Sequence, residues 1–181
     1  YLGQGSWDNL YKEGIFTSRF DVFDEKSVSN EWINVITPKY WTVSSGQVVF
    51  SESIVLPDGS QVNGLATFLQ PGSNSMFRSS GSSLDNSDRR FYVELDYLYR
   101  DFVGDVVIEL IGYDSLGNEV DRASLNIINT NTPASSSKVE KDASLRLKRN
   151  PQISSVKVIV NVNLVEGIFL IDELKIDWEL M

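Results

Sequence analysis

The sequence predicts an all-β protein, a sandwich of two antiparallel sheets. About ten short segments alternate apolar and polar residues, the pattern that gives a strand one buried face. Segments rich in Gly, Pro, Asn, Asp and Ser separate them, as is typical of the turns in such folds. No segment combines the length and the periodicity that would predict a helix.

The chain of 181 residues is long enough for one domain with a substantial core. Hydrophobic residues make up 41% of it, including nine Phe, seven Tyr and four Trp, so we expect an ordered fold. Residues 1–14 contain three glycines and little periodicity, and we interpret them as a lead-in segment or linker. Residues 15–181 are predicted to form a single β-sandwich domain.

Composition excludes several classes of function. Asp and Glu total 25 against 16 Lys and Arg, and a net charge of −9 repels phosphate backbones, so we expect no nucleic-acid partner. No apolar run reaches the roughly 18 residues of a membrane span, so no membrane insertion is expected. The chain has no Cys and no His, which excludes disulfides, thiol nucleophiles and Ser-His-Asp catalysis. We therefore expect a protein that is not an enzyme.

The predicted strands in the first half of the chain are short. The first lies at residues 16–23, where FTSRFDVF alternates, and three more follow at 40–43, 47–50 and 64–69. Leu56-Pro57-Asp58-Gly59 is a turn by its residue chemistry. Residues 79–90 are polar and rich in Ser, which predicts a long surface loop.

The second half alternates over longer stretches. Residues 91–99 place Phe, Val, Leu and two Tyr on one face, and residues 138–147 alternate as strictly. Residues 105–113 and 119–128 are predicted to pair as a hairpin around the turn at 115–118.

Residues 153–180 form the clearest pattern in the chain. Val156, Val158, Val160, Val162 and Leu164 share one parity, Glu166-Gly167 interrupts the run, and a second apolar run continues to Leu180. Two such runs joined by a Gly-containing break predict an antiparallel hairpin. Asp172 falls on the apolar parity of the second run, where a carboxylate is costly unless it has a partner.

Three motifs resemble one superfamily. The segment Gly167-Ile168-Phe169-Leu170-Ile171-Asp172-Glu173-Leu174-Lys175-Ile176 resembles the last strand of galactose-binding-like jelly rolls, which include many carbohydrate-binding modules. The Trp-x-Val unit at Trp41 and the Val-Val-Ile-x-Leu strand with its Asp-x-x-Gly-Asn turn match that family in the same order. The resemblance covers roughly residues 16–178 and implies a jelly-roll β-sandwich.

The resemblance also implies a function. It predicts a non-catalytic carbohydrate-binding module that anchors a larger secreted, cell-surface or phage tail protein to a polysaccharide or cell-surface glycan. Neighbouring domains of that larger protein would be further partners, and the location would be extracellular, on the cell surface or in a virion. The alternative is an architectural β-sandwich, a spacer or decoration domain of a virion or surface assembly, without a glycan site.

Aromatic side chains are the first candidates for a sugar site, because their faces cover the C–H surfaces of sugars. Trp41 and Tyr97 are expected in the core. Trp32, Tyr99, Arg100 and Tyr113 lie near predicted strand ends and are the predicted carbohydrate-binding residues. A binding module should expose two or three aromatics in one groove, whereas a spacer should bury nearly all of them and present an apolar patch.

Asp172 is the candidate metal ligand, since calcium binds carboxylate and carbonyl oxygens. In the resembling family a structural calcium often ties the last strand to the first, and Asp172 matches the acidic position of the motif. Asp21 or Asp24 would supply a second carboxylate, although the chain lacks the family's usual Gly-x-Phe-Glu start. Alternatively, Asp172 accepts hydrogen bonds from backbone amides at a strand bend.

A pair of carboxylates for glycoside hydrolysis is the enzymatic alternative. Glu94 and Asp96 lie two residues apart on one strand face, and Glu109 could lie opposite them on a neighbouring strand. On a chain of net charge −9 a solvated acidic face is the expected meaning of this pattern.

Overall fold

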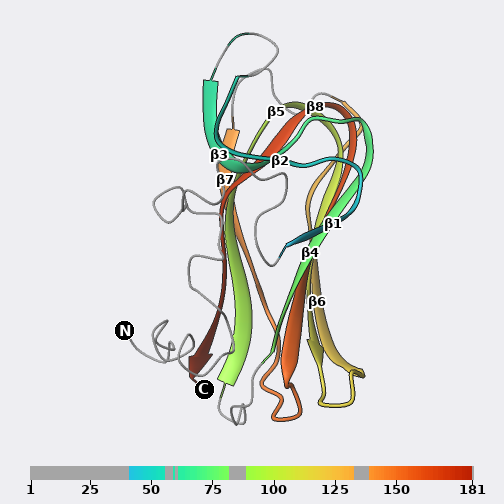
Figure 1. Cartoon of the computed structure of the whole chain (residues 1–181), viewed down its shortest axis with the longest axis vertical. Coiled ribbons are helices and arrows are strands. Elements are labelled where there is room, and N and C mark those ends of the chain that lie inside the picture. Colours follow the sequence, from blue (N-terminus) through green and yellow to red (C-terminus); the bar gives the residue numbers. More distant parts are fainter. Residues whose placement is uncertain (1–40, 56–58, 60, 82–88, 133–138, 181) are drawn as a thin grey trace.

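A computed structural model describes residues 41–55, 59, 61–81, 89–132 and 139–180 of the chain. These residues form eight strands: β1 (Thr42–Ser45), β2 (Val49–Val55), β3 (Gln61–Phe68), β4 (Gly72–Gly81), β5 (Arg89–Tyr113), β6 (Glu119–Thr130), β7 (Val139–Arg146) and β8 (Ser155–Leu180) (Figure 1). The described part of the chain holds no helix of the length and apolarity needed to cross a membrane. The predicted lead-in at 1–14 and first strand at 16–23 lie outside the described residues.

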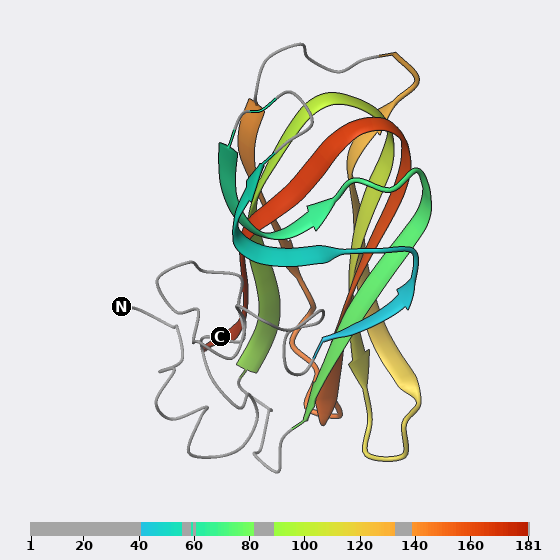
Figure 2. The ribbon, with the colours of Figure 1, turned by 45° about the horizontal axis from the view of Figure 1, so that its top comes forward.

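Two long strands form the frame of the molecule. β5 has 25 residues and β8 has 26, and they pair antiparallel from Arg89 opposite Leu180 to Tyr113 opposite Ser155. Both strands arch over at the top of Figure 1 and run down again in a second layer, as Figure 2 also shows. Each long strand therefore contributes one half to each layer of the sandwich.

The two halves organise two leaves of one curled antiparallel sheet. In the first leaf the strand order is β7–β5–β8–β3–β2, with residues 89–100 of β5 and 168–180 of β8. In the second leaf the order is β6–β5–β8–β4–β1, with residues 104–113 of β5 and 155–164 of β8. The predicted all-β jelly-roll sandwich is confirmed, as is the predicted hairpin of residues 105–128.

The predicted hairpin within residues 153–180 is wrong, because these residues continue as one strand. Gly167 has φ 86° and faces Asp101, which has φ 51°, and the β5–β8 register shifts at this place. Positive φ values at a bulge bend a strand without reversing it. Because both strands bend together, their ladder continues through the bend. The glycine marks a bulge here, as glycines inside strands often do.

The bend changes which residues face the core. On β5 the inward residues have odd numbers up to Tyr99 and even numbers from Val106 onward. On β8 they are even up to Leu164 and odd at Phe169 and Ile171. The apolar pattern of the second run predicts that Ile168 and Leu170 face the core together with Leu174. For Ile168 and Leu170 this prediction is wrong. These residues form a separate small cluster with Leu98 on the outer face of the first leaf.

A second bulge on β8 explains the position of Asp172. Asp96 pairs with Glu173 and Tyr97 pairs with Ile171, so Asp172 is the extra residue between them. The inward parity returns to even numbers at Leu174 and Ile176 after this bulge. A bulge residue lies outside the regular alternation, so its number no longer implies an apolar face.

The core lies between the two leaves and is rich in aromatic rings. Phe169 is fully buried, and its ring lies 5.7 Å from that of Phe68, 5.8 Å from Tyr97 and 6.1 Å from Phe102. Trp41 and Tyr97 belong to this core, as expected from the sequence. Burial raises the pKa of Tyr97, with smaller contributions from Tyr99 and Asp142.

Candidate functional site

Polar side chains gather on the outer face of the second leaf. Ile108 on β5, Val158 on β8 and Met76 on β4 face the core, so their chain neighbours face outward. The cross-strand register aligns the outward residues of β6, β5, β8 and β4 into rows. We call this surface the second-leaf face and define it by Ser75, Phe77, Glu109, Ile111, Tyr113, Arg122, Lys157, Ile159 and Asn161, together with Glu119, which binds Arg122.

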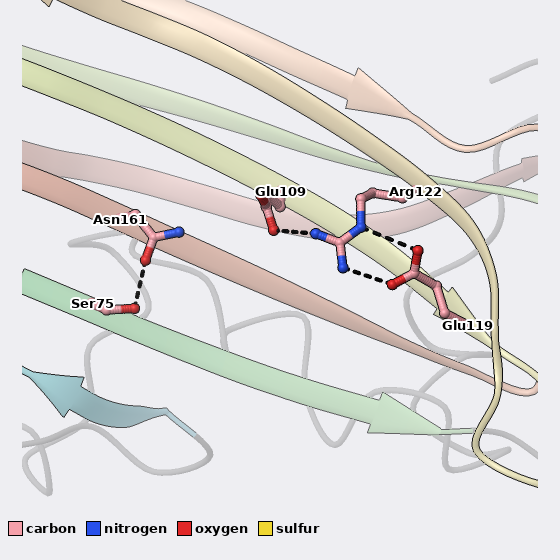
Figure 3. Close-up of polar contacts among 5 residues, drawn as sticks. All are labelled: Ser75, Glu109, Glu119, Arg122 and Asn161. Atoms are coloured by element: carbon pink, nitrogen blue, oxygen red, sulfur yellow. Dashed lines mark hydrogen bonds and ion pairs between the residues drawn. The ribbon is translucent and has the colours of Figure 1, made fainter.

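Arg122 joins two glutamates on this face (Figure 3). Its Nη1 donates to Oε2 of Glu109 at 2.7 Å, and its Nη2 and Nε donate to the two carboxylate oxygens of Glu119 at 2.6 and 3.2 Å. The hydrogen bond from Arg122 lowers the pKa of Glu119, and the same bond raises the pKa of Arg122. Glu119 and Arg122 are therefore both charged at neutral pH. Exposed ion pairs add little stability, so the main effect is to hold these groups in fixed orientations.

Tyr113 lies at the end of β5 beside this network. It shares its parity with Glu109 and pairs with Glu119 across the sheet. It also makes a minor electrostatic contribution to the raised pKa of Arg122, after that of the Glu119 hydrogen bond. The side chain is half-buried. The structure thus places one predicted sugar-binding residue on the second-leaf face.

A second polar group lies on the β4 and β8 part of the face. The Ser75 hydroxyl donates to Oδ1 of Asn161 at 2.7 Å (Figure 3). Nearby, the Lys157 ammonium lies 4.3 Å from the centre of the Phe77 ring, a cation–π contact. Both Phe77 and Lys157 are partly exposed. None of these four residues was predicted from the sequence, because their contacts depend on the β4–β8 register.

Two aromatic side chains distinguish this face from the rest of the described surface. Among the aromatic residues whose burial the structure describes, Phe77 and Tyr113 are the ones that are partly exposed. The exposed large aliphatic residues come from four separate segments: Val55, Leu116, Leu125 and Val165. On the described surface, the partly exposed aromatic residues therefore share the second-leaf face, whereas the exposed aliphatic residues are scattered.

The other predicted sugar-binding residues do not join this face. Tyr99 is 8% exposed and its ring packs 6.3 Å from that of Tyr97 and 6.5 Å from that of Phe102, so its expected exposure is wrong. It faces inward because it precedes the bend. Arg100 is partly exposed and lies in the first leaf, at the bend, whereas Tyr113 lies at the far end of β5 in the second leaf. Trp32 lies outside the described residues.

The calcium site stays a prediction. Asp21, its alternative Asp24 and the side chain of Asp172 lie outside the described part of the structure. Among the residues that are described, no group of three or more Asp, Glu, His or Cys could hold a metal ion. The structure places a backbone bulge at Asp172. Because a bulge residue lies outside the regular alternation, the number of Asp172 no longer places its carboxylate on the apolar face of the strand.

The carboxylates of the hydrolase alternative do not come together. Glu94 and Asp96 belong to the outer face of the first leaf, and Glu109 belongs to the second-leaf face. All three are on β5, but the bend separates them onto opposite sides of the sandwich. Glu109 instead shares Arg122 with Glu119, whose lowered pKa does not suit a general acid.

Comparison with known proteins shows the fold. No family model matches the chain, and no curated protein matches it. The enzymatically active domain of tailspike protein 4 from bacteriophage CBA120 is similar, with 16% identity and a TM-score of 0.54 over 85% of this chain and 21% of that one. A Stig cyclase, Fisc from Fischerella sp. TAU, has 13% identity and a TM-score of 0.50, with 92% and 96% covered.

Carbohydrate-binding modules are also among the similar solved structures. TmCBM61 in complex with β-1,4-galactotriose has 20% identity and a TM-score of 0.43, with 76% of this chain and 88% of that one covered. This chain spans about a fifth of the tailspike chain. The identities of the tailspike domain and the cyclase to this chain, 16% and 13%, show a shared fold alone, so function must be argued from the site.

Proposed function

We propose that this domain is a non-catalytic carbohydrate-binding module that anchors a larger secreted, cell-surface or phage tail protein to a polysaccharide. We further propose that the second-leaf face binds the glycan. One observation carries the proposal. The described aromatics that are partly exposed, Phe77 and Tyr113, share this face with polar groups that are already ordered by hydrogen bonds.

The chemistry of the face suits a sugar. A pyranose ring has an apolar C–H surface that packs on aromatic faces, and hydroxyl groups that need donors and acceptors. Phe77 and Tyr113 offer the first kind of contact, and Ser75, Asn161 and the Glu109–Arg122–Glu119 network offer the second. Because the polar groups are held in place before a ligand arrives, binding costs less ordering entropy.

The charge state of Glu119 fits binding without catalysis. Hydrolysis of a glycosidic bond needs a carboxylic acid that stays protonated near neutral pH. The hydrogen bond from Arg122 instead stabilises the ionised form of Glu119. The catalytic activity of the larger protein, where there is one, would belong to a neighbouring domain.

Retention on immobilised polysaccharides and whole-cell glycans tests the proposal. Phe77→Ala and Tyr113→Ala should each weaken binding about two- to twelvefold, since an aromatic contact contributes about 0.5–1.5 kcal/mol beyond its area. Val55→Ala is the matched control, because Val55 is 69% exposed and lies on β2 in the first leaf. Loss of binding in the control, or full binding in both aromatic variants, would place the glycan elsewhere.

The architectural spacer or decoration domain is the second candidate. The observation in its favour is that most of the described aromatic side chains lie in the core. A spacer would not be retained on any glycan, with calcium present or chelated. That result would replace the binding-module proposal with the architectural one, and size-exclusion chromatography with neighbouring domains of the parent protein would then be the next experiment.

A further inference from the structure

Charged groups on the second-leaf face are engaged with one another. Its described cations are Arg122 and Lys157, which flank Ile111 in one cross-strand row. Arg122 donates three hydrogen bonds to Glu109 and Glu119, and the Lys157 ammonium lies over the Phe77 ring. A carboxylate or sulfate on a ligand would have to compete with these contacts to bind either cation.

An anionic ligand would also meet repulsion. Glu109 and Glu119 lie beside Arg122, and the whole chain carries a net charge of −9. Like charges at short range are unfavourable even at the surface. Sugar hydroxyls face no such conflict, because an ionised carboxylate has about four acceptor positions and the contacts with Arg122 leave some of them available.

The face is also longer than one sugar. Tyr113 pairs with Ser155 and Phe77 pairs with Ile159, so the two aromatics are separated by four residues along β8 and two strand spacings. Strand geometry places their Cα atoms about 16 Å apart, a distance that exceeds one pyranose ring. Lys157 lies midway between Ser155 and Ile159 on β8, in the same stretch.

From this arrangement we infer that the ligand is a neutral polysaccharide, bound as an extended chain of several sugar units across β5, β8 and β4. This inference rests on the proposed carbohydrate-binding function and names the class of glycan. The neutral chain would pack on Tyr113 at one end and on Phe77 at the other. Its hydroxyls would bond to the glutamates and, beyond Phe77 along β8, to the Ser75–Asn161 pair. Lys157 would move off the Phe77 ring.

Affinity measurements with two classes of polysaccharide test the inference. The neutral class is soluble β-1,4-glucan, xylan, mannan and galactan, and the anionic class is polygalacturonate, alginate and hyaluronan. We expect the tightest ligand to be neutral and its Kd to change less than about twofold between about 0.05 and 0.5 M NaCl. The affinity of the Lys157→Gln variant for this neutral ligand should stay within about threefold of the wild-type affinity, because a neutral chain needs no cation. The melting curve of the variant shows that it is folded.

Other results separate the failure of this inference from the failure of the function. A tightest ligand that is anionic, sensitive to salt and lost in Lys157→Gln would overturn the neutral class and keep carbohydrate binding. Oligosaccharides of increasing length test the extended mode, and a monosaccharide that binds as tightly as its polymer would overturn it. No binding in either class would overturn the proposed function itself.

Discussion

At the scale of single residues, Tyr99 and Tyr113 show how position decides a role. Both tyrosines are on β5, both have odd numbers and both lie near the ends of predicted strands. Tyr99 lies before the bend and packs in the core, whereas Tyr113 lies after it, on the second-leaf face. The same side chain therefore stabilises the core at one position and is available to a ligand at the other.

The calcium ligand is a second question at this scale. We propose that Asp172 binds a structural calcium ion. Calcium at about 100 times its Kd would stabilise the fold by about 2.7 kcal/mol, which corresponds to about 5–10 °C in a domain of this size. Chelation should therefore lower the melting temperature of the wild type by that amount and leave Asp172→Ala unchanged. An equal response of the two proteins to chelator would remove the metal site.

At the scale of elements, the bends in β5 and β8 make the sandwich. Gly167 lies in the bend of β8, where an added Cβ would collide with the backbone carbonyl oxygen of Asp101 on β5. The close approach of the two backbones is what lets the ladder continue through the bend. A residue with a side chain would force the strands apart at the point where both leaves are joined.

Two glycines with the same backbone conformation test this account. Gly167 has φ 86° and Gly117, in the turn between β5 and β6, has φ 85°, but a Cβ at Gly117 meets no atom within 4 Å. Gly117→Ala should cost about 1–2 kcal/mol of unfolding free energy, the cost of the left-handed conformation alone. Gly167→Ala should cost clearly more, because the steric clash adds to it. Equal losses in urea denaturation would show that the close approach does not matter.

At the scale of the whole molecule, we expect the two leaves to unfold as one cooperative unit. β5 and β8 run through both leaves, and the Phe169 ring contacts rings from β3 and β5. Because β5 and β8 belong to both leaves and the core lies between the leaves, neither leaf is expected to fold without the other.

Phe169→Ala measures this coupling. Removal of the fully buried ring should lower the free energy of unfolding by about 3–5 kcal/mol. Leu116→Ala, at a side chain that is 85% exposed, should change it by less than about 0.5 kcal/mol. Far-UV circular dichroism and tryptophan fluorescence should report a single shared transition in both variants. Two separate transitions would show that the leaves unfold independently.

The amino-acid sequence alone determined the strand class, the inward faces of residues 91–97 and 156–164, and the core positions of Trp41 and Tyr97. These features are local, since alternation with a period of two fixes the faces of a strand wherever the strand is regular. The tertiary structure decided the rest: that residues 155–180 are one strand, that Tyr99 and Tyr113 face opposite ways, and that Ser75 meets Asn161, 86 residues away. Bulges and cross-strand register set these outcomes, and a shift of one residue exchanges the two faces of a strand.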